Sequence, residues 1–351
     1  MIAGIIKNSA VNSKILAMNR NILTFDDYIK LSKFDSLEKA AQYLSQSSQY
    51  SEIFKDLNPS SSSAYELEIL LKGTLNRNIK SLITFLVSCS SPSASFFNDI
   101  FSVKDDIAAI KASVRHIFTK DSTYKQNIFY FNSKTFEKLT HVTDFNGFFV
   151  ALNDTVYEGI FKSFAQNPQR QNLFDIECAI DSFWCKYIFK SIKNHLEKSD
   201  LKIARSAYGV RFELNLLLFI LRLKKYYKKA FPPEKIFPYV NIFHHRLSSD
   251  EIQKIVEAEN EEKTLSILMN TPYSAVFSNN YRFFEKPAEE YILKLYSSLY
   301  RSNPYSIAAI LYYLCIQKNE IKNIITTIEG LRLKLSPAQI QKHIRVSALF
   351  G

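Results

Sequence analysis

Glycine is scarce in this sequence, with seven residues in a chain of 351. A fold rich in β-strands needs many tight turns, and glycine supplies the backbone conformations that those turns require. The glycines also never cluster, so no loop of the kind that cradles phosphate is present. Because 46% of the residues are hydrophobic, the chain can bury substantial cores. We therefore predict a predominantly α-helical protein, with a length typical of two or three domains.

Cysteines and long apolar runs are also few. The four cysteines are scattered, and no pair has the short spacing of a metal knuckle or a redox motif, so we expect reduced thiols in the cytosol. The first residues lack the basic region and the apolar length of a signal peptide. The longest apolar runs, such as "SIAAILYYLCI", are shorter than the roughly 20 residues of a spanning helix. We expect neither classical export nor a membrane span.

Groups of residues that carry chemistry are missing as well. An Asp-rich magnesium motif needs further carboxylates after its first pair, and neither Asp26–Asp27 nor Asp105–Asp106 has them at the required positions. His244 and His245 are adjacent, so on a helix they would point about 100° apart and could not share one metal ion. No catalytic set of Ser, His and Asp can be argued from spacing. We predict no metal, no cofactor and no catalysis.

The formal net charge of +11 is compatible with nucleic acid, an anionic membrane surface or an acidic protein as partner. The densest basic cluster, "LRLKKYYKKAF", includes Lys224 to Lys229 and continues an apolar helix. We interpret it as a solvated helix end whose charge complements the helix dipole. No nucleic-acid motif accompanies it, so nucleic-acid binding is the least favoured hypothesis, and a salt titration by gel shift would test it.

One motif occurs three times along the chain. The stretches "YLSQSSQYSEIF", "ALNDTVYEGIF" and "ILMNTPYSAVF" each contain Leu, a short polar segment, Tyr, and Phe four residues after the Tyr. Tyr50, Tyr157 and Tyr273 therefore correspond to one position seen three times. Because this position recurs in each module, we predict that Tyr157 is a packed ring with a satisfied hydroxyl group rather than an exposed binding residue.

A second landmark has the same period. Asp106, Glu213 and Glu320 each precede an aliphatic residue and lie 107 residues apart, twice over. The distance from tyrosine to acid is 56, 56 and 47 residues, so the third copy is shorter by about one helix. We predict a triplicated helical module with boundaries near Thr119 and in "FPPEKIFP", giving modules 1–119, 120–235 and 236–351.

Each of these acids is expected to stand where a long buried helix begins. There it would satisfy backbone donors or a neighbouring base, a structural rather than catalytic role. Helix starts are also predicted at "TFDD", "DSLE", "SSDE" and "SPAQ", each a cap with an acid or amide at the third helical position. Pro337 adds the first-position proline that favours a helix start.

Taken together, these residues resemble the C subunits of archaeal and bacterial V/A-type rotary ATPases, a family related to the d subunit of the eukaryotic V-ATPase. The likeness rests on "NSKILAMNRNILTFDDYIKLSKFDSLEKAAQYLSQSSQY", "ELNLLLFILRLKKYY" and "ILYYLCIQKNEIKNIITTIEGLRLKLSPAQIQKHI", and it covers nearly the whole chain. The acid-Ile-x-Asn pattern of the family's last module is intact at Glu320, Ile321 and Asn323. The earlier modules depart from it, with Ala109 and Leu216 at the position of the Asn.

The resemblance implies an all-α, funnel-like, pseudo-threefold protein that is peripheral on the cytoplasmic face of the membrane. It would be a non-catalytic central-stalk subunit, with the proteolipid ring and the shaft of the soluble ATPase as partners. Its work would be mechanical coupling of ATP hydrolysis or synthesis to ion transport. The alternative is a cytosolic helical-repeat scaffold that binds other proteins, and copurification with a membrane ring distinguishes the two.

Overall fold

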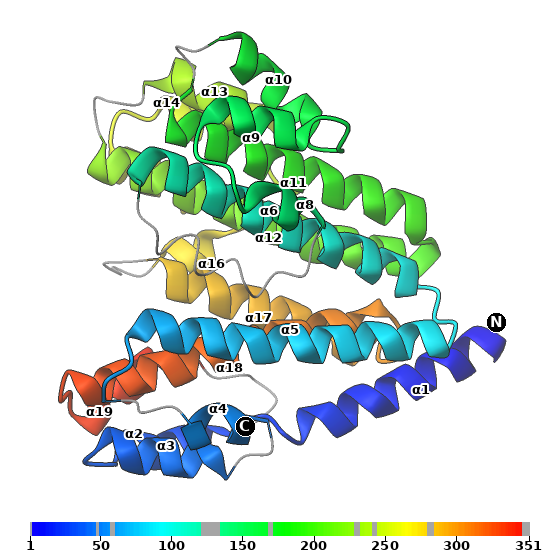
Figure 1. Ribbon diagram of the computed structural model, residues 1–351, viewed down its shortest axis with the longest axis vertical. Coiled ribbons are helices and arrows are strands. Elements are labelled where there is room, and N and C mark those ends of the chain that lie inside the picture. The colour runs from blue at the N-terminus through cyan, green and yellow to red at the C-terminus, as the bar shows by residue number, and fades with distance from the viewer. Residues whose placement is uncertain are drawn as a thin grey trace. The chain divides into compact units, whose positions relative to one another are not determined.

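The computed structural model describes residues 2–46, 49–56, 60–120, 134–167, 171–227, 232–240, 244–278 and 284–345. Within these ranges every regular element is a helix, and Figure 1 shows them as a set of long and short helices without a sheet. The prediction of an all-α fold is therefore confirmed.

One order of elements occurs three times. Two short helices precede the recurrent tyrosine, a third short helix follows it, and two long helices complete the series. In the first copy these are α2 (Phe25–Ser32), α3 (Leu37–Ser45), α4 (Ser51–Asp56), α5 (Ala64–Ser88) and α6 (Ala94–Thr119). In the second they are α8 (Lys134–Leu139), α9 (Phe145–Leu152), α10 (Glu158–Gln166), α11 (Leu173–His195) and α12 (Lys198–Tyr226). In the third they are α14 (Ser249–Glu257), α15 (Glu261–Leu268), α16 (Ser274–Phe277), α17 (Glu285–Ser302) and α18 (Ile307–Arg332).

Within the described ranges, three further helices lie outside this order: α1 (Ile2–Asn19), α13 (Pro233–Val240) and α19 (Pro337–His343). The proline-rich stretch that we expected to interrupt the helices is itself the short helix α13, with Pro238 inside it. The break lies before it, because α12 ends at Tyr226. The module boundaries themselves stay a prediction.

The shorter third copy has lost length rather than an element. Its long helix α17 has 18 residues, whereas α5 has 25 and α11 has 23. Its short helix α16 has four residues, against six in α4 and nine in α10. A loss spread over two helices keeps the order of elements.

The chain divides into two compact units that interleave in sequence. Unit 1 comprises Met1–Ala94, Glu197–Ala207 and Asn280–Gly351, and unit 2 comprises Ser95–Leu196 and Tyr208–Asn279.

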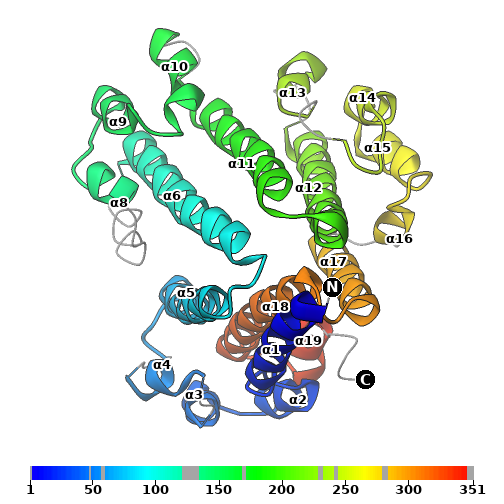
Figure 2. The same ribbon diagram turned by 90° about the vertical axis from the view of Figure 1, so that its right-hand side faces the viewer.

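In unit 1 the central element is α18, whose first ten residues, from Ile307 to Ile316, are all buried. Helices α1, α2, α5, α17 and α19 pack against it, and Figure 2 shows α1 alongside α18. A Cβ atom on Gly330 would lie 2.7 Å from the Ile340 side chain, so this close approach of α18 and α19 requires glycine. A helix buried on nearly all sides forms the core of this unit.

In unit 2 the long helices α6 and α11 lie side by side (Figure 2) and are joined by polar contacts. The Tyr187 hydroxyl donates to Asp99 at 2.5 Å, and Lys111 pairs with Asp181 at 2.5 Å. Beside these polar contacts, apolar residues of α6, α9, α10 and α11 form one hydrophobic core. Tyr157 lies in this core, with 2% of its surface exposed. Unit 2 thus places a recurrent tyrosine in its interior.

Three of the four predicted caps are confirmed. Thr24 with Asp27, Ser248 with Glu251 and Ser336 with Gln339 each form a reciprocal capping box, the last with Pro337 in the first turn. The fourth was placed one residue too early. Ser36 caps α3, because its hydroxyl oxygen accepts a hydrogen bond from the Lys39 backbone amide. Asp35 forms an ion pair with the Lys39 side chain.

Candidate functional site

The three recurrent acids lie near the middle of long helices, at Asp106 in α6, Glu213 in α12 and Glu320 in α18. The prediction that they mark helix starts is therefore wrong. The apolar residues that precede each acid are already helical, so the first-turn amides of the same helix are out of reach. Each carboxylate accepts hydrogen bonds from other segments of the chain instead.

Asp106 accepts hydrogen bonds from two hydroxyl groups of the following copy. The Tyr157 hydroxyl donates to Oδ2 at 2.6 Å, and the Thr135 hydroxyl donates to the same atom at 3.0 Å. Burial and the bond to Asp106 hold the pKa of Tyr157 far above its usual range, so the phenol stays protonated and acts as the donor.

Glu213 is fully buried and receives more donors. The Tyr273 hydroxyl donates to Oε2 at 2.5 Å. Three successive backbone amides, those of His245, Arg246 and Leu247, also donate to this carboxylate, at 2.5 to 3.1 Å. Several donors compensate a carboxylate for the water it has lost. Next to this contact, a Cβ atom on Gly209 would lie 2.5 Å from the His245 ring, so only glycine lets the loop approach α12.

Glu320 is 2% exposed and binds the first segment of the chain. The Leu23 amide donates to Oε1 at 2.8 Å, and the Tyr50 hydroxyl is hydrogen-bonded to the same carboxylate. The side-chain amides of Gln49 and Gln317 approach Oε2 at 3.4 Å. Burial raises the pKa of Glu320 to about 7, against the opposing effect of these hydrogen bonds.

All six predicted signature residues therefore meet as tyrosine–acid pairs, but each pair joins two copies. Tyr157 and Tyr273 bind the acid of the copy before their own, and Tyr50 of the first copy binds Glu320 of the last. The sequence period shows which residues occupy equivalent positions. It does not indicate which copies of the repeat contact one another. Glu213 satisfies backbone donors, as expected for these acids, but the sequence did not indicate that the donors are the amides at 245–247.

A cavity of about 30 Å³ lies beside Glu320, with room for about two water molecules. Leu23, Phe25 and Tyr28 line one side, and Asn319 and Glu320 of α18 line another. Asn319 is 9% exposed, and its side chain makes no hydrogen bond within the part of the chain that the structure describes. The packing against this acid is therefore incomplete.

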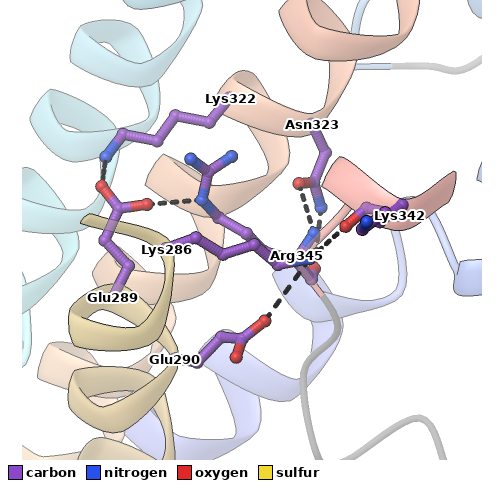
Figure 3. Close-up of polar contacts among 7 residues, drawn as sticks. All are labelled: Lys286, Glu289, Glu290, Lys322, Asn323, Lys342 and Arg345. Carbon is purple, nitrogen blue, oxygen red and sulfur yellow. Dashed lines mark hydrogen bonds and ion pairs between the residues drawn. The ribbon is translucent and has the colours of Figure 1, made fainter. Parts of the chain in front are cut away.

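Asn323, three residues after Glu320, binds the backbone of Arg345 in the last copy. Its side chain accepts from the Arg345 amide and donates to the Arg345 carbonyl, both at 2.9 Å (Figure 3). The Arg345 guanidinium pairs with Glu289 at 2.5 Å, and Lys322 pairs with the same carboxylate. These contacts fasten the segment after α19 to α17 and α18. They give a physical reason for Asn at this position where the other copies have Ala109 and Leu216.

The basic cluster at the end of α12 is partly internal. Lys224 is 8% exposed, and its ammonium donates to the Val256 carbonyl at 2.6 Å, capping the end of α14. Burial lowers the pKa of Lys224. Lys225 pairs with Glu261 at 2.9 Å. These two lysines do not belong to a solvated helix end, and Lys228 and Lys229 lie outside the described residues.

The arrangement holds segments of the chain together. Among the described residues, no three His, Cys, Asp or Glu side chains gather as metal ligands. His244 bonds to Ser249, and His245 packs on Gly209. Burial raises the pKa of the Cys178 and Cys185 thiols to about 12, so neither is an activated nucleophile. No helix in the described ranges combines the length and the apolarity needed to cross a membrane.

Fold and site define an all-helical protein in which carboxylates of long helices face tyrosines from other segments of the chain. The chain belongs to the ATP synthase (C/AC39) subunit family, which its residues 11–343 match. It is similar to the C subunit of the A-type ATP synthase of Methanosphaera stadtmanae, with 19% identity over 325 residues. That alignment covers 89% of this chain and 81% of the relative.

Proposed function

We propose that this chain is a non-catalytic central-stalk subunit of a V/A-type ATPase, which links the rotating shaft of the soluble ATPase to the membrane proteolipid ring. The observation that carries the proposal is family membership over residues 11–343. The protein would be peripheral, on the cytoplasmic face of the membrane, and would pass torque between ATP turnover and ion transport.

The internal structure supports a mechanical role. A torque-bearing element must be stiff, and the hydrogen bonds of Asp106 and Glu213 tie successive copies to one another. The repeated order of helices agrees with the expected pseudo-threefold, funnel-like arrangement, which is part of this proposal. Among the described residues no group of three side chains could hold a metal ion, and in this proposal the chain contributes no ATP chemistry itself.

Reconstitution tests the role directly. Vesicles that contain the membrane sector and the soluble ATPase head are prepared with and without this chain, and ATP-driven ion uptake and ATP hydrolysis are measured together. We expect uptake only with the chain and hydrolysis by the head in both preparations. The control is the chain alone, which should hydrolyse no ATP. Full uptake without the chain would exclude the coupling role.

The alternative is a cytosolic helical-repeat scaffold that binds unrelated proteins, and the element order fits it equally well. The two hypotheses differ in what copurifies from native membranes. A coupling protein should be isolated with both the proteolipid ring and the soluble head. Isolation with neither, but with other cytosolic proteins, would favour the scaffold.

A further inference from the structure

A tyrosine–acid contact occurs three times, and each time it joins two copies of the repeat. A buried or half-buried carboxylate in the middle of a long helix receives the phenol hydroxyl that stands between two short helices of another copy. The third occurrence differs in one respect, because it joins the two ends of the sequence: Tyr50 lies near the start and Glu320 near the end.

The segment that carries Tyr50 is held to α18 by polar groups at two positions one helical turn apart. Gln49 donates to the Gln317 side chain at 3.0 Å and to the Tyr50 oxygen at 2.9 Å. Leu23 donates to the Glu320 carboxylate at 2.8 Å. Gln317 is fully buried and Glu320 nearly so. The polar contacts to α18 lie on one turn of that helix, and two further contacts lie outside it: Gln341 of α19 donates to Ser32, and Arg77 of α5 pairs with Glu52.

The cavity described above lies within this same attachment. Its walls come from the N-terminal segment on one side and from α17, α18 and Arg345 on the other. Apolar contact between the two sides is interrupted there, and a space of this size admits water to the polar groups. Hydrated and incompletely packed contacts open at lower free energy than a closed core.

We propose that residues 23–46 and 49–56 form a strap, the N-terminal strap, which fastens the beginning of the chain to α18 and can release from it as one unit while unit 2 stays folded. The strap comprises α2, α3 and α4. It is the cyclic counterpart of the segments 134–166 and 249–277, which dock on Asp106 and Glu213. This inference concerns the fold and does not rest on the proposed function.

Hydrogen exchange of the full-length chain, followed by mass spectrometry, tests the strap. Tyr50→Phe removes a hydrogen bond to a buried carboxylate, so exchange in α2, α3 and α4 should accelerate roughly tenfold. Exchange in α8, α9 and α10 should not change. Tyr157→Phe is the matched control and should show the reverse pattern.

Asp106→Asn distinguishes two assignments of the Asp106 partner. In the proposed pairing the partner is Tyr157 of the next copy, and in a pairing inside one module it would be Tyr50. The substitution should accelerate exchange in α8 to α10 and leave the strap unchanged. Acceleration of the strap by Asp106→Asn, or an equal effect of Tyr50→Phe on all three segments, would overturn the cross-copy assignment.

A measurement on the unaltered chain guards against variants that do not fold. In a series of low urea concentrations, amides of α2, α3 and α4 should share one opening free energy that lies below the value for α14 and α15. Exchange of the strap only through global unfolding would show that it is not a separable unit.

Discussion

Tyr157 illustrates how one side chain serves both packing and pairing. Its ring lies in the core of unit 2 and contacts Phe183 edge-on, with ring centroids 5.5 Å apart, while its hydroxyl binds Asp106. Truncation should therefore leave both a cavity and an unpaired acid.

We expect Tyr157→Ala to lower the free energy of unfolding by roughly 3 kcal/mol or more, and Tyr157→Phe by about 1.5 kcal/mol. Tyr226, at 57% exposure, is the control, and Tyr226→Ala should change stability by less than about 0.5 kcal/mol. Urea denaturation measures all three. Unchanged stability of Tyr157→Ala together with lost binding to partner proteins would identify this tyrosine as a binding residue instead.

The raised pKa of Glu320 predicts that the stability of the chain depends on pH. Its pKa is about 7 in the folded chain, against an ordinary value of 4.5, because burial disfavours its charge. The folded state thus holds the proton more tightly than the unfolded state. The contribution to stability is complete below pH 4.5, is lost as the pH rises to 7, and is constant above that.

The difference in unfolding free energy between the unaltered chain and Glu320→Gln should fall by roughly 3 kcal/mol from about pH 4.5 to about pH 7.5. The glutamine variant has no proton to lose at this position, so the comparison cancels the titration of other groups, histidines included. Urea denaturation at several pH values provides the measurement. A difference that stays constant over this range would show that Glu320 is ionised throughout.

At the scale of elements, the sequence predicted the helices and their starts better than their mutual packing. A hydroxyl followed by an acid or amide three residues later located three capping boxes, because such a cap is a local interaction. The start of α18 was missed, since its buried first turns are apolar on nearly all sides and show no helical period. The pairing of Tyr50 with Glu320 depends on chain topology, which local patterns do not encode.

Gly209 and Gly159 offer a matched pair of substitutions in helices. A Cβ atom on Gly209 would meet the His245 ring at 2.5 Å, in the loop whose amides bind Glu213, whereas one on Gly159 would meet no atom within 4 Å. Gly209→Ala should cost about 1–3 kcal/mol by forcing that loop away. Gly159→Ala should stabilise by about 0.5–1 kcal/mol because it restricts the unfolded chain.

Thermal unfolding of each variant, compared with the unaltered chain, shows whether the substitution raises or lowers stability. Equal effects of the two substitutions would mean that the loop at 245–247 adjusts without loss of its bonds to Glu213. The opposite signs expected here come from the surroundings of the two helices, because the substitution is the same in both.

At the scale of the whole molecule, the two compact units do not coincide with the three copies of the repeat. Unit 1 contains the first and last parts of the sequence, and α12 contributes residues to both units, divided between Ala207 and Tyr208. The period of 107 residues predicted the repeat, but contacts between copies determine which segments form one core. The Tyr50–Glu320 pair belongs to unit 1, and the other two pairs belong to unit 2.

This division predicts how the chain unfolds. Calorimetry of the full-length chain should show two overlapping transitions, since each unit has its own core and its own tyrosine–acid pairs. Glu320→Gln should shift one transition, and Asp106→Asn and Glu213→Gln should both shift the other. Each shift should be several degrees, because loss of a bond to a carboxylate is worth about 1.5–3 kcal/mol. A single transition that all three variants move equally would mean that α12 couples the units into one cooperative structure.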